Sequence, residues 1–197
     1  MVPLQSQSFI PRLREKLSRL QPRLIAPEGR PRAGVLLLFY DVDGETRLLF
    51  TRRTVLVEHH KGQICFPGGS REEDDPDLLY TALRETFEEV GVRPEHVEPI
   101  GRLHDIVSFG SNFVITPYVG AVQAPLPYPF VHAQHEVEEI LEVPVASLLD
   151  EANVIRETQE VDGEKVEALS YRFGDHVIWG ATARILRQLL ELLRTSD

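Results

Sequence analysis

Residues 67–92 read PGGSREEDDPDLLYTALRETFEEVGV, and the interpretation of the whole chain starts from this stretch. A tight glycine turn opens it, an acidic loop follows, and the remainder has a helical pattern. Asp77 is a suitable N-cap residue, and Gly91 is the kind of residue that ends a helix in the left-handed conformation. We therefore predict a helix over residues 78–90, with Pro94 preventing its continuation.

This predicted helix has two distinct faces. At 100° per residue, one face collects apolar side chains, namely Leu79, Ala82, Leu83, Phe87 and Val90. The opposite face carries three carboxylates, Glu85, Glu88 and Glu89, and Arg84 flanks them at a spacing that allows an ion pair with Glu88. Carboxylates near the C-terminal end of a helix, which is the negative end of its dipole, destabilise the helix by roughly 0.3–1 kcal/mol each.

A divalent cation would reverse the sign of this repulsion. Mg²⁺ and Mn²⁺ take oxygen ligands, keep several waters and are commonly held by a few carboxylates together with substrate phosphate. A solvated acidic helix face is the alternative for an isolated ExxEE pattern. The glycine turn, the acidic loop and Arg84 beside the glutamates favour a metal site.

Residues 84–92, RETFEEVGV, resemble the second half of the Nudix box, in which R-E-U-x-E-E-x-G-U follows a glycine and a more distant glutamate. The resemblance implies an α/β fold, a Nudix-type α/β/α sandwich with a mixed β-sheet. It also implies hydrolysis of a nucleoside diphosphate linked to another group, with Mg²⁺ or Mn²⁺ held by Glu85, Glu88 and Glu89. The first half of the box departs from the pattern, because Gly69 lies one position early and Asp75 replaces the glutamate.

The composition of the whole chain indicates a globular protein. Its 197 residues carry a net charge of −10, although residues 1–33 alone hold seven Lys and Arg against two Glu. An acidic body argues against binding nucleic acid through its backbone. One cysteine excludes an internal disulfide, and the chain lacks an apolar run of 18 residues, so we expect a cytoplasmic protein without stable membrane insertion.

We expect an amphipathic N-terminal helix and a linker segment in residues 1–32, and a Nudix hydrolase domain in residues 33–197. The basic amphipathic helix over residues 9–20 has two interpretations, packing on its own domain or lying on a membrane. The predicted strands are residues 33–40, 46–51, 100–107, 113–122 and 137–145, and a hairpin joins residues 154–159 to 166–173. A proline-rich loop covers residues 123–135, a short helical turn residues 146–149 and a last helix residues 176–193.

A second resemblance narrows the family. Residues 48–69, LLFTRRTVLVEHHKGQICFPGG, look like the extra motif upstream of the box in coenzyme A pyrophosphatases. The longer loop, the TALRE run at 81–85 and the IWGATA run at 178–183 are also similar to that subfamily. Glu58 stands close to where the motif has an arginine. The implied reaction is hydrolysis of coenzyme A to 4′-phosphopantetheine and 3′,5′-ADP.

The resemblance and the required chemistry assign expected roles to individual residues. Arg84 is expected to orient the glutamates, Glu88 to share a second ion or its water, and Glu136 to act as general base from a loop that precedes a strand. The candidates for binding substrate phosphates are Arg52, Arg53, Lys61, Gly69 and Arg71. We interpret Cys65 as a buried small side chain rather than a nucleophile, and Trp179 as a core or helix anchor.

Two other functions compete with this interpretation. The substrate could be another nucleoside diphosphate derivative, such as ADP-ribose or NADH. A module that senses a nucleotide without cleaving it belongs to another class, and it would be expected to lack the metal glutamates. The oligomeric state is left open by the sequence.

Overall fold

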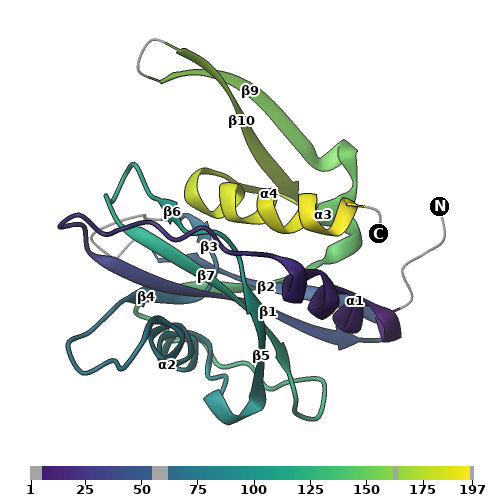
Figure 1. Ribbon diagram of the computed structural model, residues 1–197. Coiled ribbons are helices and arrows are strands. Elements are labelled where there is room, and N and C mark those ends of the chain that lie inside the picture. Colours follow the sequence, from purple (N-terminus) through teal and green to yellow (C-terminus); the bar gives the residue numbers. More distant parts are fainter. Residues whose placement is uncertain (1–5, 55–61, 162–163, 196–197) are drawn as a thin grey trace.

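The computed structural model describes residues 6–54, 62–161 and 164–195 (Figure 1). Helix α1 (Ser6–Arg19), the short α3 (Val145–Leu149) and α4 (Gly180–Arg194) lie on one side of a central sheet, and α2 (Leu78–Val90) lies on the other. The expected α/β/α sandwich with a mixed sheet is therefore confirmed.

Within the described residues, the central sheet contains eight strands. Its main path runs in the order β3 (Ile64–Cys65), β2 (Glu45–Arg53), β1 (Arg32–Val42), β7 (Val114–Val122) and β5 (Val97–Arg102). The strands β4 (Gly68–Ser70), β6 (Ile106–Val107) and β8 (Val137–Pro144) pair with β1, β7 and β2 respectively. β1 and β7 are parallel, and the other pairs in this sheet are antiparallel.

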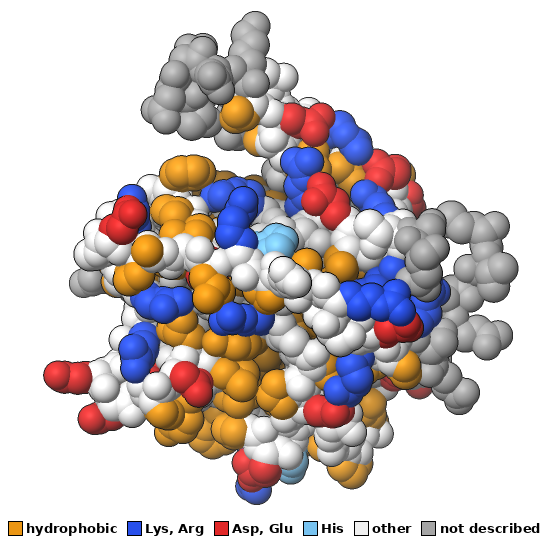
Figure 2. All heavy atoms as spheres, in the orientation of Figure 1, with side chains coloured by type: hydrophobic (Ala, Val, Ile, Leu, Met, Phe, Trp, Pro, Cys, Tyr) orange, Lys and Arg blue, Asp and Glu red, His pale blue; other side chains and the backbone are white. Residues whose placement is uncertain are grey.

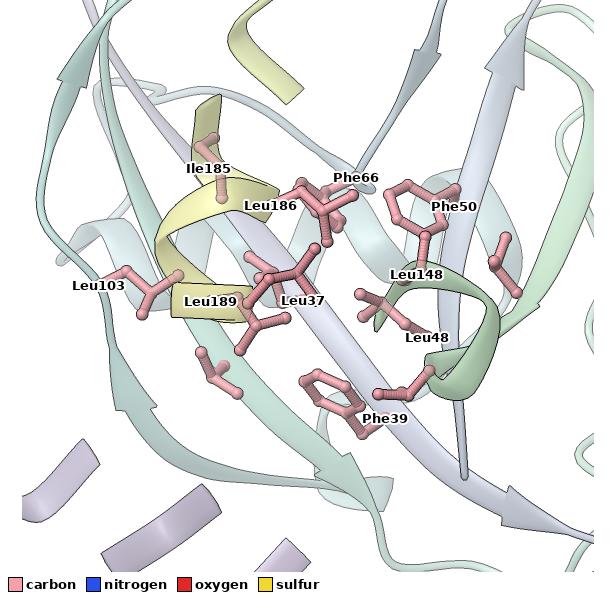
Figure 3. Packing of buried hydrophobic residues seen from close by; sticks show 14 of the residues in the cluster. Leu37, Phe39, Leu48, Phe50, Phe66, Leu103, Leu148, Ile185, Leu186 and Leu189 are labelled. Carbon is pink, nitrogen blue, oxygen red and sulfur yellow. The ribbon is translucent and has the colours of Figure 1, made fainter. Parts of the chain in front are cut away.

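β1 is the continuous apolar run expected to form a buried strand, and both of its faces are covered. Leu36, Leu38 and Tyr40 point toward α2, whereas Leu37 and Phe39 point toward α1 and α4. Figure 3 shows Leu37 and Phe39 together with Leu48 and Phe50 of β2, packed against side chains of α3 and α4. The sheet thus separates two hydrophobic clusters.

Two glycines bring α2 and β4 close to β1. A Cβ atom on Gly34 would lie 2.3 Å from the carbonyl oxygen of Leu78, so α2 begins directly against this strand. The segment predicted as a glycine turn is in fact strand β4, and it pairs with residues 33–35 of β1, whereas β2 pairs with residues 39–42. Gly68 has a φ of 146°, and a Cβ there would lie 2.3 Å from the carbonyl oxygen of Gly34.

The N-terminal helix packs on the body of the protein. Phe9, Leu13 and Leu17 belong to the same buried cluster as the core of the sheet. The membrane interpretation would need this apolar face to be free, and the face is occupied. Within the described residues, no helix combines the length and the apolar character needed to span a bilayer.

Two sequence predictions for the C-terminal region need revision. The last helix begins at Gly180 and not at residue 176, because His176–Ile178 forms strand β11, paired with β10. Ile178 is buried as a strand residue, which explains why it matched an apolar helical stripe. Trp179 is 52% exposed and is not a core residue, but it is the N-cap residue of α4, which agrees with the other alternative, a helix anchor.

The predicted hairpin is present as β9 (Val154–Val161) and β10 (Glu164–Phe173). It projects away from the sandwich beside α4 (Figure 1). Figure 2 shows both basic and acidic side chains on this part of the surface, and Arg156 of β9 forms an ion pair with Glu151. Two short 3₁₀ helices, Pro94–His96 and Glu151–Asn153, complete the described elements.

Candidate active site

Helix α2 has the predicted limits and the predicted caps. The Asp77 carboxylate accepts a hydrogen bond of 2.8 Å from the backbone N–H of Tyr80. Gly91 has a φ of 73°, and its N–H donates to the carbonyl of Phe87. The buried face of the helix is rotated from the apolar stripe, because Phe87 is 48% exposed while Thr81, Thr86 and Glu89 are buried.

Glu89 is the most buried of the three glutamates, with a side chain only 2% exposed. One carboxylate oxygen accepts a 3.2 Å hydrogen bond from the N–H of Gly68, and the other lies 3.5 Å from Nη1 of Arg53. Burial raises the pKa of Glu89 to about 8, against the lowering effects of Arg53 and Gly68 and with further raising by Glu85 and Glu136. A cation bound beside this carboxylate would favour its ionised form.

Glu85 lies one turn earlier, and its carboxylate rests against the glycine strand. A Cβ atom on Gly69 would lie 2.4–2.6 Å from the three carboxylate atoms of Glu85, so this side chain fits only because residue 69 has none. Burial raises the pKa of Glu85, Arg84 lowers it, and Glu88 and Glu136 raise it again. Glu88 is more open, with 55% of its side chain exposed.

Arg84 connects the acidic loop to the glutamates. Its Nε and Nη2 donate to the two oxygens of Asp75 at 3.1 and 3.0 Å, and its Nη1 lies 2.9 Å from Glu85 and 3.1 Å from Glu88. Asp75 is 3% exposed and also accepts from the Thr81 hydroxyl at 2.8 Å. Hydrogen bonds from Arg84 hold the pKa of Asp75 well below its usual range.

The geometry of Arg84 is that of a residue that orients the glutamates. Asp75 is shorter than the glutamate of the Nudix box, and the loop is one residue longer, yet its carboxylate still accepts hydrogen bonds from the Arg84 guanidinium. The sequence analysis did not predict the ion pair between Asp75 and Arg84. The one indication of it in the sequence is that Asp75 lies next to the position where the Nudix box has a glutamate.

Glu136 follows a loop that is hydrogen-bonded to the end of α2. The N–H of Ala133 donates to the carbonyl of Glu89 at 3.0 Å, and the N–H of Val131 donates to that of Val90 at 3.1 Å. Glu136 is 41% exposed at its side chain, and its negative charge raises the pKa of both Glu85 and Glu89. The loop therefore brings Glu136 into the electrostatic surroundings of the helix glutamates.

The other predicted substrate contacts divide into two groups. Arg53 and Gly69 lie against Glu89 and Glu85. Arg52 instead hydrogen-bonds Glu139 at 3.0 Å and forms an ion pair with Glu138, and Arg71 donates to the carbonyls of Asp75 and Pro76. Lys61 and Glu58 lie outside the described residues.

The residues present fit a hard divalent cation. The carboxylate oxygens of Glu85 and Glu89 suit Mg²⁺ or Mn²⁺, and burial, which is nearly complete at Glu89 and partial at Glu85, raises the pKa of both. Among the described residues, no three or more His, Cys, Asp or Glu side chains are grouped so that they could hold a metal ion by themselves, as a protein cage does. An ion that keeps several waters and takes further ligands from a substrate needs no such cage.

Cys65 lies at the back of this site, next to Thr51. Its Sγ is 3.4 Å from the Thr51 hydroxyl, and burial followed by the charge of Glu89 raises the pKa of the thiol to about 11. The thiol is therefore neutral near pH 7, which supports a packing role.

Comparison with known proteins places the chain in a family. The NUDIX domain model matches residues 30–160. The protein named uncharacterized Nudix hydrolase NudL from Pectobacterium atrosepticum is 34% identical over 193 residues, which cover 94% of this chain and 95% of that protein. Nudix hydrolase 15, mitochondrial, from Arabidopsis thaliana is 36% identical over 79% of this chain, and the match spans 56% of its own length.

Solved structures show the same fold at low sequence identity. The NUDIX domain of Shewanella oneidensis NrtR, solved with ADP ribose, has a TM-score of 0.56 at 18% identity and covers 91% of this chain and 97% of its own. The match to the domain model covers most of the chain, and it includes α2 and its glutamates. The chain therefore belongs to the Nudix family, and it is a hydrolase of that family that acts on the diphosphate bond of nucleoside diphosphate derivatives.

Proposed function

We propose that the protein hydrolyses coenzyme A to 3′,5′-ADP and 4′-phosphopantetheine, using Mg²⁺ or Mn²⁺. The proposal rests on one observation: the segment that resembles the coenzyme A pyrophosphatase motif lies beside the glutamates of α2. Residues 48–69 contribute Arg53, Gly68 and Gly69, and each of these contacts Glu85 or Glu89. A subfamily motif placed against the carboxylates supports a role in choosing the substrate.

The proposed roles follow from the geometry. Glu85 and Glu89 would hold the metal, and Glu88, which is more exposed, would share a second ion or one of its waters. A bound divalent cation would neutralise diphosphate oxygens and lower the pKa of a coordinated water. Arg84 keeps Glu85 and Glu88 in place, and Gly69 leaves room for Glu85.

Glu136 is the proposed general base. Its charge acts on both Glu85 and Glu89, which supports a carboxylate near enough to this site to accept a proton from an attacking water. Replacing Glu136 with Gln should lower kcat with CoA by roughly 10²- to 10⁴-fold, whereas Mn²⁺ binding should weaken far less, because the variant removes a neighbouring negative charge and no proposed ligand. A variant with wild-type kcat would assign the base to another group.

A reducing, cytoplasmic compartment and a small-molecule partner complete the proposal. The single cysteine cannot form an internal disulfide, and the body outside residues 1–33 is acidic. An anionic substrate is compatible with this charge where a metal bridges the two.

Product analysis by mass spectrometry tests the substrate. The protein would be incubated with CoA, ADP-ribose and NADH, each with and without Mg²⁺ or Mn²⁺. Metal-dependent release of 3′,5′-ADP and phosphopantetheine from CoA, faster than cleavage of the other two, is the expected result. Faster cleavage of ADP-ribose or NADH would reject CoA as the substrate, and nucleotide binding without cleavage would favour a sensing module.

A further inference from the structure

The arginines described around the three glutamates differ in how fully their donors are used. Arg84, Arg52 and Arg71 donate to carboxylates or carbonyls at 3.4 Å or less. Among the described residues, Arg53 lies 3.5 Å from Glu89, its charge also acts on the Cys65 thiol, and its buried Nε has no hydrogen-bond partner. A buried donor without an acceptor is unfavourable, so its presence beside an active site calls for a partner.

The backbone fixes where Arg53 points. Its N–H donates to the carbonyl of Gln63 at 3.0 Å, and its own carbonyl accepts from Gly62 at 3.1 Å. The β2–β8 register shifts between Arg52 and Arg53, and Arg52 pairs with the carboxylates of β8. Arg53, in contrast, reaches Glu89 of α2, and 24% of its side chain remains exposed.

The charges around Arg53 indicate what the partner is. The Arg53 guanidinium lies 3.5 Å from the buried carboxylate of Glu89, and the carboxylate of Glu85, one turn away on α2, rests against Gly69, so the cation proposed above would bind close to Arg53. A cation bound there would repel the Arg53 guanidinium unless an anion lay between them. A phosphate oxygen is such an anion, and the guanidinium fork matches phosphate geometry.

We propose that Arg53 binds the diphosphate of the substrate through its Nε and Nη groups, and that Glu89 holds the guanidinium in position for this contact. The inference rests on the proposed function only in requiring a diphosphate at this site, whichever nucleotide carries it. In this proposal Arg52 links β2 to β8 through its ion pairs with Glu138 and Glu139, and it does not contact the substrate.

The test measures binding of imidodiphosphate, a diphosphate analogue that resists hydrolysis, to the Mn²⁺-loaded protein by calorimetry. Arg53→Gln should weaken this binding by about 10- to 100-fold, and Arg53→Lys should weaken it less, because one ammonium replaces part of the fork. Mn²⁺ affinity without imidodiphosphate should stay equal or become tighter, because a neighbouring positive charge has been removed.

Arg47→Gln is the matched control. Arg47 is on the same strand, its Nε is also buried without a partner, and its guanidinium pairs with Glu45 away from α2. This variant should bind imidodiphosphate like the wild type. Absence of imidodiphosphate binding by the wild type, undiminished binding by Arg53→Gln, or an equal loss of Mn²⁺ affinity would each overturn the proposal. Because CoA is absent from the assay, failure of CoA cleavage is a separate result.

Discussion

At the scale of single residues, the site depends on side chains that hold the glutamates in place. Arg84 bridges the acidic loop and the helix, Gly68 donates its N–H to Glu89, and Gly69 leaves space for Glu85. The spacing in the sequence predicted that Arg84 lies beside the three glutamates, and its contacts with Glu85 and Glu88 confirm this placement, whereas its orienting role stays a prediction. The sequence could not predict that Arg71 turns toward loop carbonyls, because a basic residue reads the same whether it faces substrate or backbone.

The Asp75–Arg84 pair should make stability depend on pH. The pKa of Asp75 is lower in the folded protein than in the unfolded chain, so its ionised form stabilises the fold above about pH 4. This contribution is lost as the pH falls through the folded pKa. Asp75→Asn should lower the free energy of unfolding by about 1.5–3 kcal/mol at pH 7, and the difference from wild type should shrink below pH 4.

Urea unfolding at pH 7 and pH 3 checks this prediction. Asp74→Asn is the control, because Asp74 is an exposed neighbour in the same loop. A constant difference between Asp75→Asn and wild type at both pH values would show that the charge of Asp75 is not the cause.

Gly69→Ala should separate folding from metal binding. The added methyl group would collide with the flexible end of Glu85, so Glu85 would move while the strand keeps its place. We expect a loss of roughly 10- to 100-fold in kcat/KM, with weaker Mn²⁺ binding and a melting temperature near that of wild type. Gly44→Ala, at a turn with a φ of 79° and open space, should lose stability and keep its Mn²⁺ affinity. Wild-type Mn²⁺ affinity in Gly69→Ala would refute this account.

At the scale of elements, the position of α2 is set by β1 and by the loop before β8. Its two caps and its limits were predicted correctly, because capping uses residues adjacent in sequence. The rotation of α2 about its own axis was predicted wrongly, because Phe87 is exposed and Glu89 is buried in the structure. Hydrophobic periodicity places apolar residues inside by default, and the contacts of Glu89 with Gly68 and Arg53 come from other elements.

Gly34→Ala should disturb this arrangement strongly. The Cβ atom would lie 2.3 Å from a backbone oxygen of α2, and neither β1 nor the helix can yield as a side chain does. We expect a loss of about 1–3 kcal/mol or more in unfolding free energy, together with reduced activity. Thermal unfolding followed by circular dichroism measures it, and a melting temperature equal to that of wild type would show that α2 does not pack this closely on β1.

At the scale of the whole molecule, the N-terminal helix is part of the core. Most of the buried strands, the hairpin and the sandwich followed from apolar runs, turn residues and the family resemblance, but the strand predicted over residues 100–107 is divided into β5 and β6. The sequence analysis did not predict strand β11, because its three residues directly precede α4 and continue the apolar pattern of that helix. Only the pairing with β10 identifies them as a strand. The division between residues 1–32 and 33–197 stays a prediction.

Leu13→Ala tests how much α1 contributes to stability. Leu13 is fully buried in the main cluster, so its truncation should cost about 2–5 kcal/mol. Leu24→Ala, at a side chain 58% exposed, should change stability by no more than about 0.5 kcal/mol. If both variants unfolded like the wild type in urea, α1 would not be part of the folded core.

The central claim is that the α2 carboxylates carry a metal-dependent hydrolysis of coenzyme A, and Glu89→Gln tests it most directly. Its kcat/KM for CoA would be measured with Mg²⁺ or Mn²⁺ beside wild type and Glu191→Gln, which alters an exposed glutamate of α4. We predict a loss of at least about 100-fold for Glu89→Gln, with wild-type values for Glu191→Gln. Undiminished CoA cleavage by Glu89→Gln, or wild-type cleavage without a divalent cation, would contradict the account.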